Sequence, residues 1–305
     1  MVFLLKVIIN NVKLFLTFCL FGVEGIMIDV ESEIKNEKDE LEIEFELKTE
    51  TNLEKLSDSK FDDDVAVIIL LYKNPNFKSI LKPYELEICG KKMWKWLELA
   101  CDSYPISTAI ATPESDIVNI IKPLLTDKKY TMVLFSDTPL ITKETIKEIL
   151  TYVRAKDCNV LNLSRGYVFN TEYIKNISSI KNKLIVSFNE SDFEVADDLI
   201  ATEKISQIIQ YRILTYHLYN GVFIKDLIST FIDADVIIES GVVIEPNNII
   251  QGRTYIGKYT FLESGNKIID SVIGENCILK NSYICNSKVN KNIVVGPFEK
   301  VINKG

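Results

Sequence analysis

Asp137 is the residue whose type and position most directly suggest chemistry. It follows Ser136 and a short apolar run, Val133 to Phe135. The run predicts a buried strand, and Thr142 stands where it can cap a following helix. Open α/β sheets bind ligands at the carboxyl ends of their strands, where a carboxylate can hold a divalent cation. Asp137 is therefore the candidate metal ligand. It either still binds a metal ion or is the remnant of a residue that once did.

A different pattern begins at residue 232, where aliphatic residues recur at steps of six and later of five or six. Neither a helix nor a single strand has this period. It is typical of a coil with three flat faces, each of which contributes one inward side chain per turn. We therefore expect a parallel β-helix whose core contains Ile232, Ile238, Ile244, Ile250, Ile256, Leu262, Ile268, Ile273, Leu279, Ile284, Val289 and Val295. Asn, Asp and Gly between these positions favour tight corners with positive φ.

Two stretches of this repeat resemble a known family. "FIDADVIIESGVVIEPNNIIQGRTYIG" (231–257) and "VNKNIVVGPF" (289–298) are similar to the bifunctional bacterial N-acetylglucosamine-1-phosphate uridyltransferase/glucosamine-1-phosphate acetyltransferase. "YRILTYHLYNGVFI" (211–224) resembles the linker helix that leads into that family's coils. The resemblance extends over residues 62–305 and implies a left-handed β-helix of hexapeptide repeats.

The resemblance also implies a Rossmann-like α/β nucleotidyltransferase domain before the coils. "VAVIIL" (65–70) matches its first strand, "CGKKMWKWLELACD" (89–102) the following helix, and "GYVFNTEYI" (166–174) a later strand and turn. In that family the domain uses Mg²⁺ and a nucleoside triphosphate.

The family's phosphate loop is altered in this chain. Glycines, an arginine and a lysine normally surround the triphosphate there. The corresponding positions are Tyr72, Asn74, Asn76 and Pro83. Lys78 and Lys82 keep the loop positive and are the candidate substrate-binding residues, although surface lysines have the same appearance.

The metal site is also incomplete. Asp137 matches the family's metal aspartate, but Ala196 stands where the second ligand, an asparagine, is expected, and Asp197 or Asp198 is the alternative. The segment 103–130 is too short for the family's base-recognition element. We therefore expect Asp137 to be inherited rather than used.

Acetyl transfer is disfavoured on two grounds. The sequence carries about four coils and ends before those that hold the family's acetyl-transfer site. A base must also accept the proton of the attacking amine. The single histidine, His217, precedes the coils and is interpreted as a residue of the linker helix.

Composition and charge limit the partners. Residues 29–64 hold fifteen acidic and five basic residues, whereas the whole chain has a net charge of −8. No basic cluster stands out, which argues against a nucleic-acid partner. The six cysteines form no CxxC pair, a pattern that favours reduced thiols and a cytoplasmic protein.

The N-terminal part allows several interpretations. Residues 1–28 are apolar but interrupted by Lys6 and Lys13, and their longest uninterrupted run, Leu14 to Val23, is short for a bilayer span. They are upstream sequence before a start at Met27, a membrane anchor, or a signal peptide. Residues 29–61 form an acidic linker in which residues 41–47 alternate like an edge strand or a partner-binding segment.

The predicted domains are thus residues 62–198 (a degenerate nucleotidyltransferase-like domain), 199–220 (a linker helix) and 221–305 (the β-helix). No catalytic residue is assigned. We expect a binding or scaffold protein without catalysis; the alternative is an active nucleotidyltransferase that uses Mg²⁺ to form a nucleotide sugar of the UDP-N-acetylglucosamine type. The expected partners are further copies, most simply in a homotrimer, or a full-length relative, with a membrane only if residues 1–26 are retained.

Overall fold

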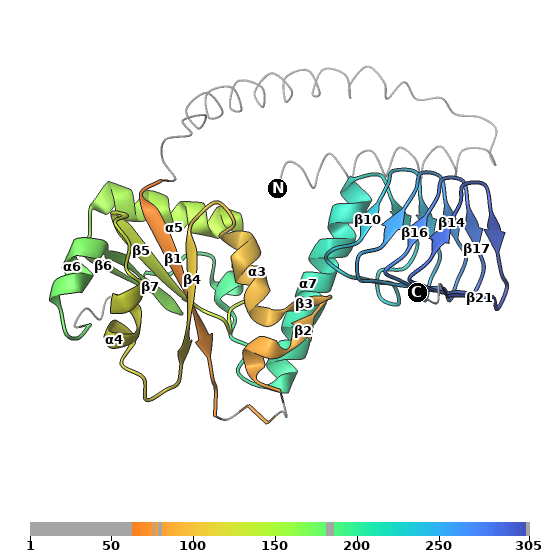
Figure 1. Cartoon of the computed structure of the whole chain (residues 1–305). Helices are drawn as coiled ribbons and strands as arrows, with labels where there is room; N and C mark the ends of the chain where they lie inside the picture. The colour runs from red at the N-terminus through yellow and green to blue at the C-terminus, as the bar shows by residue number, and fades with distance from the viewer. Residues whose placement is uncertain (1–62, 76, 79–80, 181–185, 303–305) are drawn as a thin grey trace, which may run out of the picture. The chain divides into compact units, whose positions relative to one another are not determined.

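The computed structural model describes residues 63–75, 77–78, 81–180 and 186–302 (Figure 1). The proposed strand at 41–47 and the apolar N-terminal segment lie outside these residues. The described part begins with an α/β domain and ends in a β-helix, as predicted. No described helix combines the length and the apolar character that crossing a bilayer requires.

The α/β domain is built on a five-stranded sheet with the order β4-β1-β5-β7-β6. Strands β1, β4 and β5 are parallel, and β7 runs antiparallel to both β5 and β6. The strands are β1 (Val65–Tyr72), β4 (Ile106–Ala111), β5 (Tyr130–Phe135), β6 (Val160–Leu163) and β7 (Gly166–Asn170). Strand β5 is buried along its whole length, as expected for a parallel strand covered on both faces.

Helices and short elements cover this sheet. Residues of α3 (Met93–Ala100) and α5 (Lys143–Lys156) join the core on one face, and residues of α4 (Ile117–Ile121) and α6 (Thr171–Asn176) join the core on the other. Thr142 caps α5 by accepting a hydrogen bond from the backbone N–H of Thr145 at 3.2 Å, which confirms the predicted cap. The remaining elements are β2 (Glu87–Ile88), β3 (Lys91–Lys92), η2 (Pro83–Glu85), η3 (Lys122–Leu124) and η4 (Glu190–Phe193).

Helix α7 (Leu199–Tyr219) connects the two folds. Asp198 caps it by accepting a hydrogen bond from the N–H of Ala201 at 2.7 Å. Ile205 and Ile209 pack with residues of the α/β domain, whereas Leu214 belongs to the core of the β-helix. The helix therefore contributes to both hydrophobic cores.

The β-helix consists of three parallel sheets of short strands. The first contains β8 (Phe223–Ile224), β11 (Val243–Ile244), β14 (Phe261–Leu262), β17 (Ile278–Leu279) and β20 (Val294–Val295). The second contains β9 (Phe231–Ile232), β12 (Ile249–Gln251), β15 (Lys267–Ile269), β18 (Tyr283–Cys285) and β21 (Lys300–Ile302). The third contains β10 (Ile237–Ile238), β13 (Tyr255–Ile256), β16 (Val272–Ile273) and β19 (Lys288–Val289).

All twelve predicted inward positions lie in one core, which confirms the six-residue register. The core also extends further than the predicted series, because Ile224 precedes it and Val301 packs against its last turn. Many corners have the expected positive φ, for example Asn292 at 61° and Gly241 at 80°.

Gly257 and Gly274 do not have the positive φ expected at such corners. They are required because the backbone of a neighbouring coil approaches them closely. A Cβ atom at Gly257 would lie 2.8 Å from the backbone of the next coil, and one at Gly274 would lie 2.6 Å from the coil after it. Any side chain there would therefore force neighbouring coils apart. The glycines permit close coil stacking rather than a special turn.

Candidate functional site

Asp137 lies in the turn after β5, at the carboxyl edge of the parallel strands. Its side chain is only 2% exposed. Two backbone hydrogen bonds fix this turn. The N–H of Ser136 donates to the carbonyl of Leu70 at 2.9 Å, and the N–H of Thr138 donates to the carbonyl of Phe135. The structure therefore places this carboxylate at the predicted edge and buries it.

Arg165, in the turn between β6 and β7, engages both oxygens of the Asp137 carboxylate. Its Nε donates to Oδ1 at 3.1 Å and its Nη2 donates to Oδ2 at 2.6 Å. This is the two-pronged geometry in which arginine binds carboxylates most strongly. The carboxylate is thus held by a cation from the protein itself.

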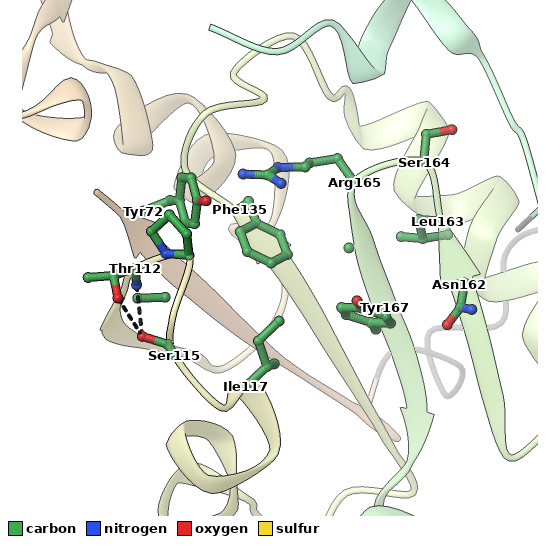
Figure 2. A pocket seen from close by; sticks show the side chains of 13 residues that line it. Tyr72, Thr112, Ser115, Ile117, Phe135, Asn162, Leu163, Ser164, Arg165 and Tyr167 are labelled. Atoms are coloured by element: carbon green, nitrogen blue, oxygen red, sulfur yellow. Dashed lines mark hydrogen bonds between the residues drawn. The ribbon is translucent and has the colours of Figure 1, made fainter. Parts of the chain in front are cut away.

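Two aromatic rings hold the guanidinium in place (Figure 2). The Arg165 Cζ lies 4.5 Å from the centroid of the Tyr72 ring and 4.3 Å from that of Phe135. The two rings meet edge to face at 5.6 Å. In addition, the backbone N–H of Tyr72 donates to the Ser136 hydroxyl at 2.9 Å. Tyr72, at a position where the resembled family has a glycine, therefore helps to hold the cation on Asp137.

Ala196 lies beside Asp137, because its backbone N–H donates to the Asp137 carbonyl at 2.8 Å. Its side chain is a buried methyl group and offers no metal ligand. The carbonyl of Asp197 accepts from the Asn74 amide at 3.1 Å, and Asp198 serves as the cap of α7. Within the described ranges, no three His, Cys, Asp or Glu side chains form a group that could hold a metal ion.

The two candidate lysines lie elsewhere. Lys78 is exposed, and Lys82 pairs with Glu85 at 3.3 Å while its side chain stays 52% exposed. The hydrogen bond to Glu85 raises the pKa of Lys82. Neither lysine has a hydrogen bond or ion pair to Asp137 among the contacts of the described residues. Their role in substrate binding stays a prediction.

A cavity of about 310 Å³ opens next to Arg165, at the carboxyl ends of β1, β4 and β5 and beside the β6–β7 turn (Figure 2). Such an edge is where α/β sheets usually bind ligands. The residues that line the cavity are Tyr72, Ala111, Thr112, Pro113, Ser115, Ile117, Phe135, Asn162, Leu163, Ser164, Arg165, Gly166 and Tyr167.

Arg165 was not among the predicted site residues, because a single arginine just before the strand predicted at 166–174 has no characteristic spacing. One weak signal exists, since the chain contains only four arginines. A second one, Arg212, also pairs with a buried aspartate, Asp192, at 3.0 Å. Two of the four arginines thus pair with buried aspartates, and the scarcity of arginine was the one hint of this in the sequence.

His217 lies near the end of α7, as the linker-helix interpretation expects, and is 3% exposed. Its Nδ1 has no hydrogen-bond partner among the described residues. Burial disfavours the charged imidazolium and lowers the pKa of His217 from 6.5 to about 4. The ring is therefore neutral at physiological pH.

This shift predicts a pH-dependent stability. Below the ordinary pKa of histidine the unfolded chain binds a proton that folded His217 does not accept until about pH 4. The free energy of unfolding should fall by about 2 kcal/mol from pH 7 to pH 5 through this residue. Urea titrations at both pH values measure the loss, and His217→Gln should remove it. An equal loss in that variant would contradict the assignment.

Several curated proteins are similar in sequence to this chain. No family model matches the chain. The "Bifunctional protein GlmU" of Listeria innocua is 34% identical over 143 residues, which is 45% of this chain and 31% of that protein. The GlmU proteins of Streptococcus agalactiae and Streptococcus thermophilus are 26% and 29% identical over 243 and 236 residues.

The streptococcal matches cover 58% and 56% of this chain and 53% and 51% of those proteins. The chain therefore spans from about a third to about half of the length of these curated relatives. The order of the elements, an α/β domain followed by a helix and a β-helix, agrees with the resemblance found in the sequence. This chain is a relative of the GlmU proteins, matched over about half of its length.

Proposed function

We propose that this chain is a nucleotidyltransferase-like protein that has lost catalysis and acts by binding or as a scaffold. The observation that carries the proposal is the ion pair between Asp137 and Arg165. Both oxygens of the carboxylate already accept hydrogen bonds from a guanidinium, and this fixed positive charge would repel a divalent cation at the same oxygens. The residues present therefore fit Mg²⁺ poorly.

The neighbouring positions support the same conclusion. Ala196 cannot supply a second ligand, and Tyr72 fills space that a glycine would leave open to phosphates. Lys78 and Lys82 are exposed and lie outside the cavity lining. Acetyl transfer gains no support from His217, whose ring is buried and neutral. We further propose a cytoplasmic location, since the five described cysteines are all unpaired.

We expect titration calorimetry to show no binding of UTP with Mg²⁺ tighter than about the millimolar range. The physical reason is the lack of a free carboxylate and of a phosphate cradle. Micromolar affinity in the parent that disappears in Asp137→Ala would overturn the proposal and favour the alternative, an active Mg²⁺-dependent nucleotidyltransferase. The retained aspartate at the strand end is the observation on which that alternative depends.

Association with further copies is the second part of the proposed role. The outward positions of the first β-helix sheet form an apolar stripe of five in-register residues: Phe223, Val243, Phe261, Ile278 and Val294. Phe223 and Val294 are both 58% exposed. A continuous apolar face of this kind is typical of an interaction surface. We propose that it packs against other copies, most simply in a symmetric trimer.

Light scattering on the full chain at tens of micromolar should therefore give an oligomer, with three copies as the expected mass. Val294→Glu places a charge in the stripe and should shift the mass toward the monomer. Ile237→Glu is the matched control, because Ile237 is 61% exposed on the third sheet. A strictly monomeric, folded parent would refute self-association and leave only a longer relative as partner.

A further inference from the structure

Strand β4 forms one edge of the five-stranded sheet, and β1 is its only partner strand among the described residues (Figure 1). At the start of this pairing the N–H of Val67 donates to the carbonyl of Pro105 at 2.9 Å. Successive residues of a strand turn their N–H and C=O groups to opposite sides. Ile106, Thr108 and Ile110 therefore direct these backbone groups away from β1.

The opposite edge of the sheet is covered. All residues of β6 are buried, and on its outer side the N–H of Val186 donates to the carbonyl of Asn162 at 3.0 Å. On β4, in contrast, the side chain of Thr108 is exposed and that of Ile110 is 53% exposed. An edge strand with open backbone groups can pair with a strand of another chain. Within the described residues, β4 is the edge at which this can happen.

Strand β4 has none of the features that usually prevent such pairing. Natural sheet edges are protected by lysine or other charged residues, by proline, by a bulge or by a very short strand. Ile106–Ala111 has six residues, none of which is charged or proline, and its register against β1 contains no bulge. Asp102, before the strand, is paired with Lys143 at 2.6 Å. Two copies of β4 can therefore meet without opposing like charges along the strand.

The outward backbone groups of β4 are arranged symmetrically about Thr108. In an antiparallel pair of two identical strands centred there, Thr108 faces its own copy and Ile106 faces Ile110 of the other copy. Each facing pair of this kind exchanges two backbone hydrogen bonds. The three side chains also lie on one face of the sheet, where Thr–Thr and Ile–Ile cross-strand pairs are stabilising. Such a two-fold interface is self-complementary and closes after two copies.

We propose that β4 is an interaction edge that pairs antiparallel with β4 of a second copy, about a two-fold axis at Thr108. This interface is separate from the apolar stripe of the β-helix and independent of the non-catalytic role. One six-residue strand per copy buries far less than the roughly 1,600 Å² of a standard stable interface. We therefore expect a Kd of about 0.1–1 mM for the edge pair. At tens of micromolar most edges stay unpaired, and the expected mass there remains that of the β-helix oligomer.

Sedimentation velocity on the full chain carrying Val294→Glu, the variant expected to weaken the β-helix association, tests the proposal. Between about 20 μM and about 1 mM the weight-average mass should rise by about half, as follows from the expected Kd. Thr108→Pro removes the N–H on the axis and Ile110→Lys adds a charge to the edge, so each should abolish the rise. Tyr173→Lys is the matched control, because Tyr173 is exposed on α6, which follows β7 rather than β4.

Amide hydrogen exchange, resolved at single residues, gives a second readout. The N–H groups of Ser107 and Ala109 face β1 and should exchange slowly at both concentrations. Those of Thr108 and Ile110 should exchange fast at about 20 μM and about two- to fourfold more slowly at about 1 mM.

A constant mass up to about 1 mM would overturn the proposal. So would a rise in mass that persists in both Thr108→Pro and Ile110→Lys, or exchange at Thr108 that is equally fast at both concentrations. Slow exchange at Thr108 and Ile110 without any rise in mass would overturn it as well, because something other than a second copy would then cover the edge. None of these outcomes bears on UTP binding, so the non-catalytic role is tested separately.

Discussion

Ile256→Asp is expected to abolish cooperative folding of the β-helix or to lower its free energy of unfolding by about 3–5 kcal/mol. Ile256 is fully buried and stands in register between Ile238 and Ile273 in the third sheet. An aspartate there would place a carboxylate inside a core formed by aliphatic side chains. Domain stabilities are commonly about 5–15 kcal/mol, so the loss should be visible in both thermal and denaturant unfolding.

The matched control is the same substitution on the outside of that sheet. Ile237 is 61% exposed and precedes the inward Ile238 in β10. Ile237→Asp should change the free energy of unfolding by less than about 0.5 kcal/mol. If Ile256→Asp instead unfolds like the parent, the assignment of inward and outward positions is wrong.

The β-helix was predictable because the same constraint recurs in every coil. Each inward position must be aliphatic, so residues as distant as Ile232 and Val295 report on one core. The reason for Gly257 was not predictable in the same way. Its need arises from the backbone of the next coil, a contact between residues far apart in sequence. Local turn preferences could not show that approach.

The candidate site was predictable only in part. The position of Asp137 followed from a strand and a cap, both local signals, and the structure places it as expected. The pairing with Arg165 joins two turns 28 residues apart and has no local pattern. The cavity likewise depends on the rings of Tyr72, Phe135 and Tyr167, which come from three different strands. Contacts between residues so far apart in the sequence cannot be predicted from local patterns.

Removing the charge of Arg165 should strongly destabilise the α/β domain. Arg165→Met keeps an unbranched apolar stem against Tyr72 and Phe135 but leaves the Asp137 carboxylate, 2% exposed, without its cation. Loss of one partner of a buried ion pair typically costs about 3–5 kcal/mol. Denaturant titration at neutral pH should show a loss of that order in the free energy of unfolding.

Asp137→Asn in the Arg165→Met background should restore a large part of this loss. The double variant no longer buries an unpaired charge, and replacing both members of a buried pair is often nearly neutral. The control for a surface ion pair is Lys143→Ala, because Lys143 and Asp102 are about half exposed and 2.6 Å apart. That change should cost at most about 1 kcal/mol. Equal losses of unfolding free energy for Lys143→Ala and Arg165→Met would mean that Arg165 does not stabilise a buried carboxylate. Asp137 would then again be a candidate metal ligand.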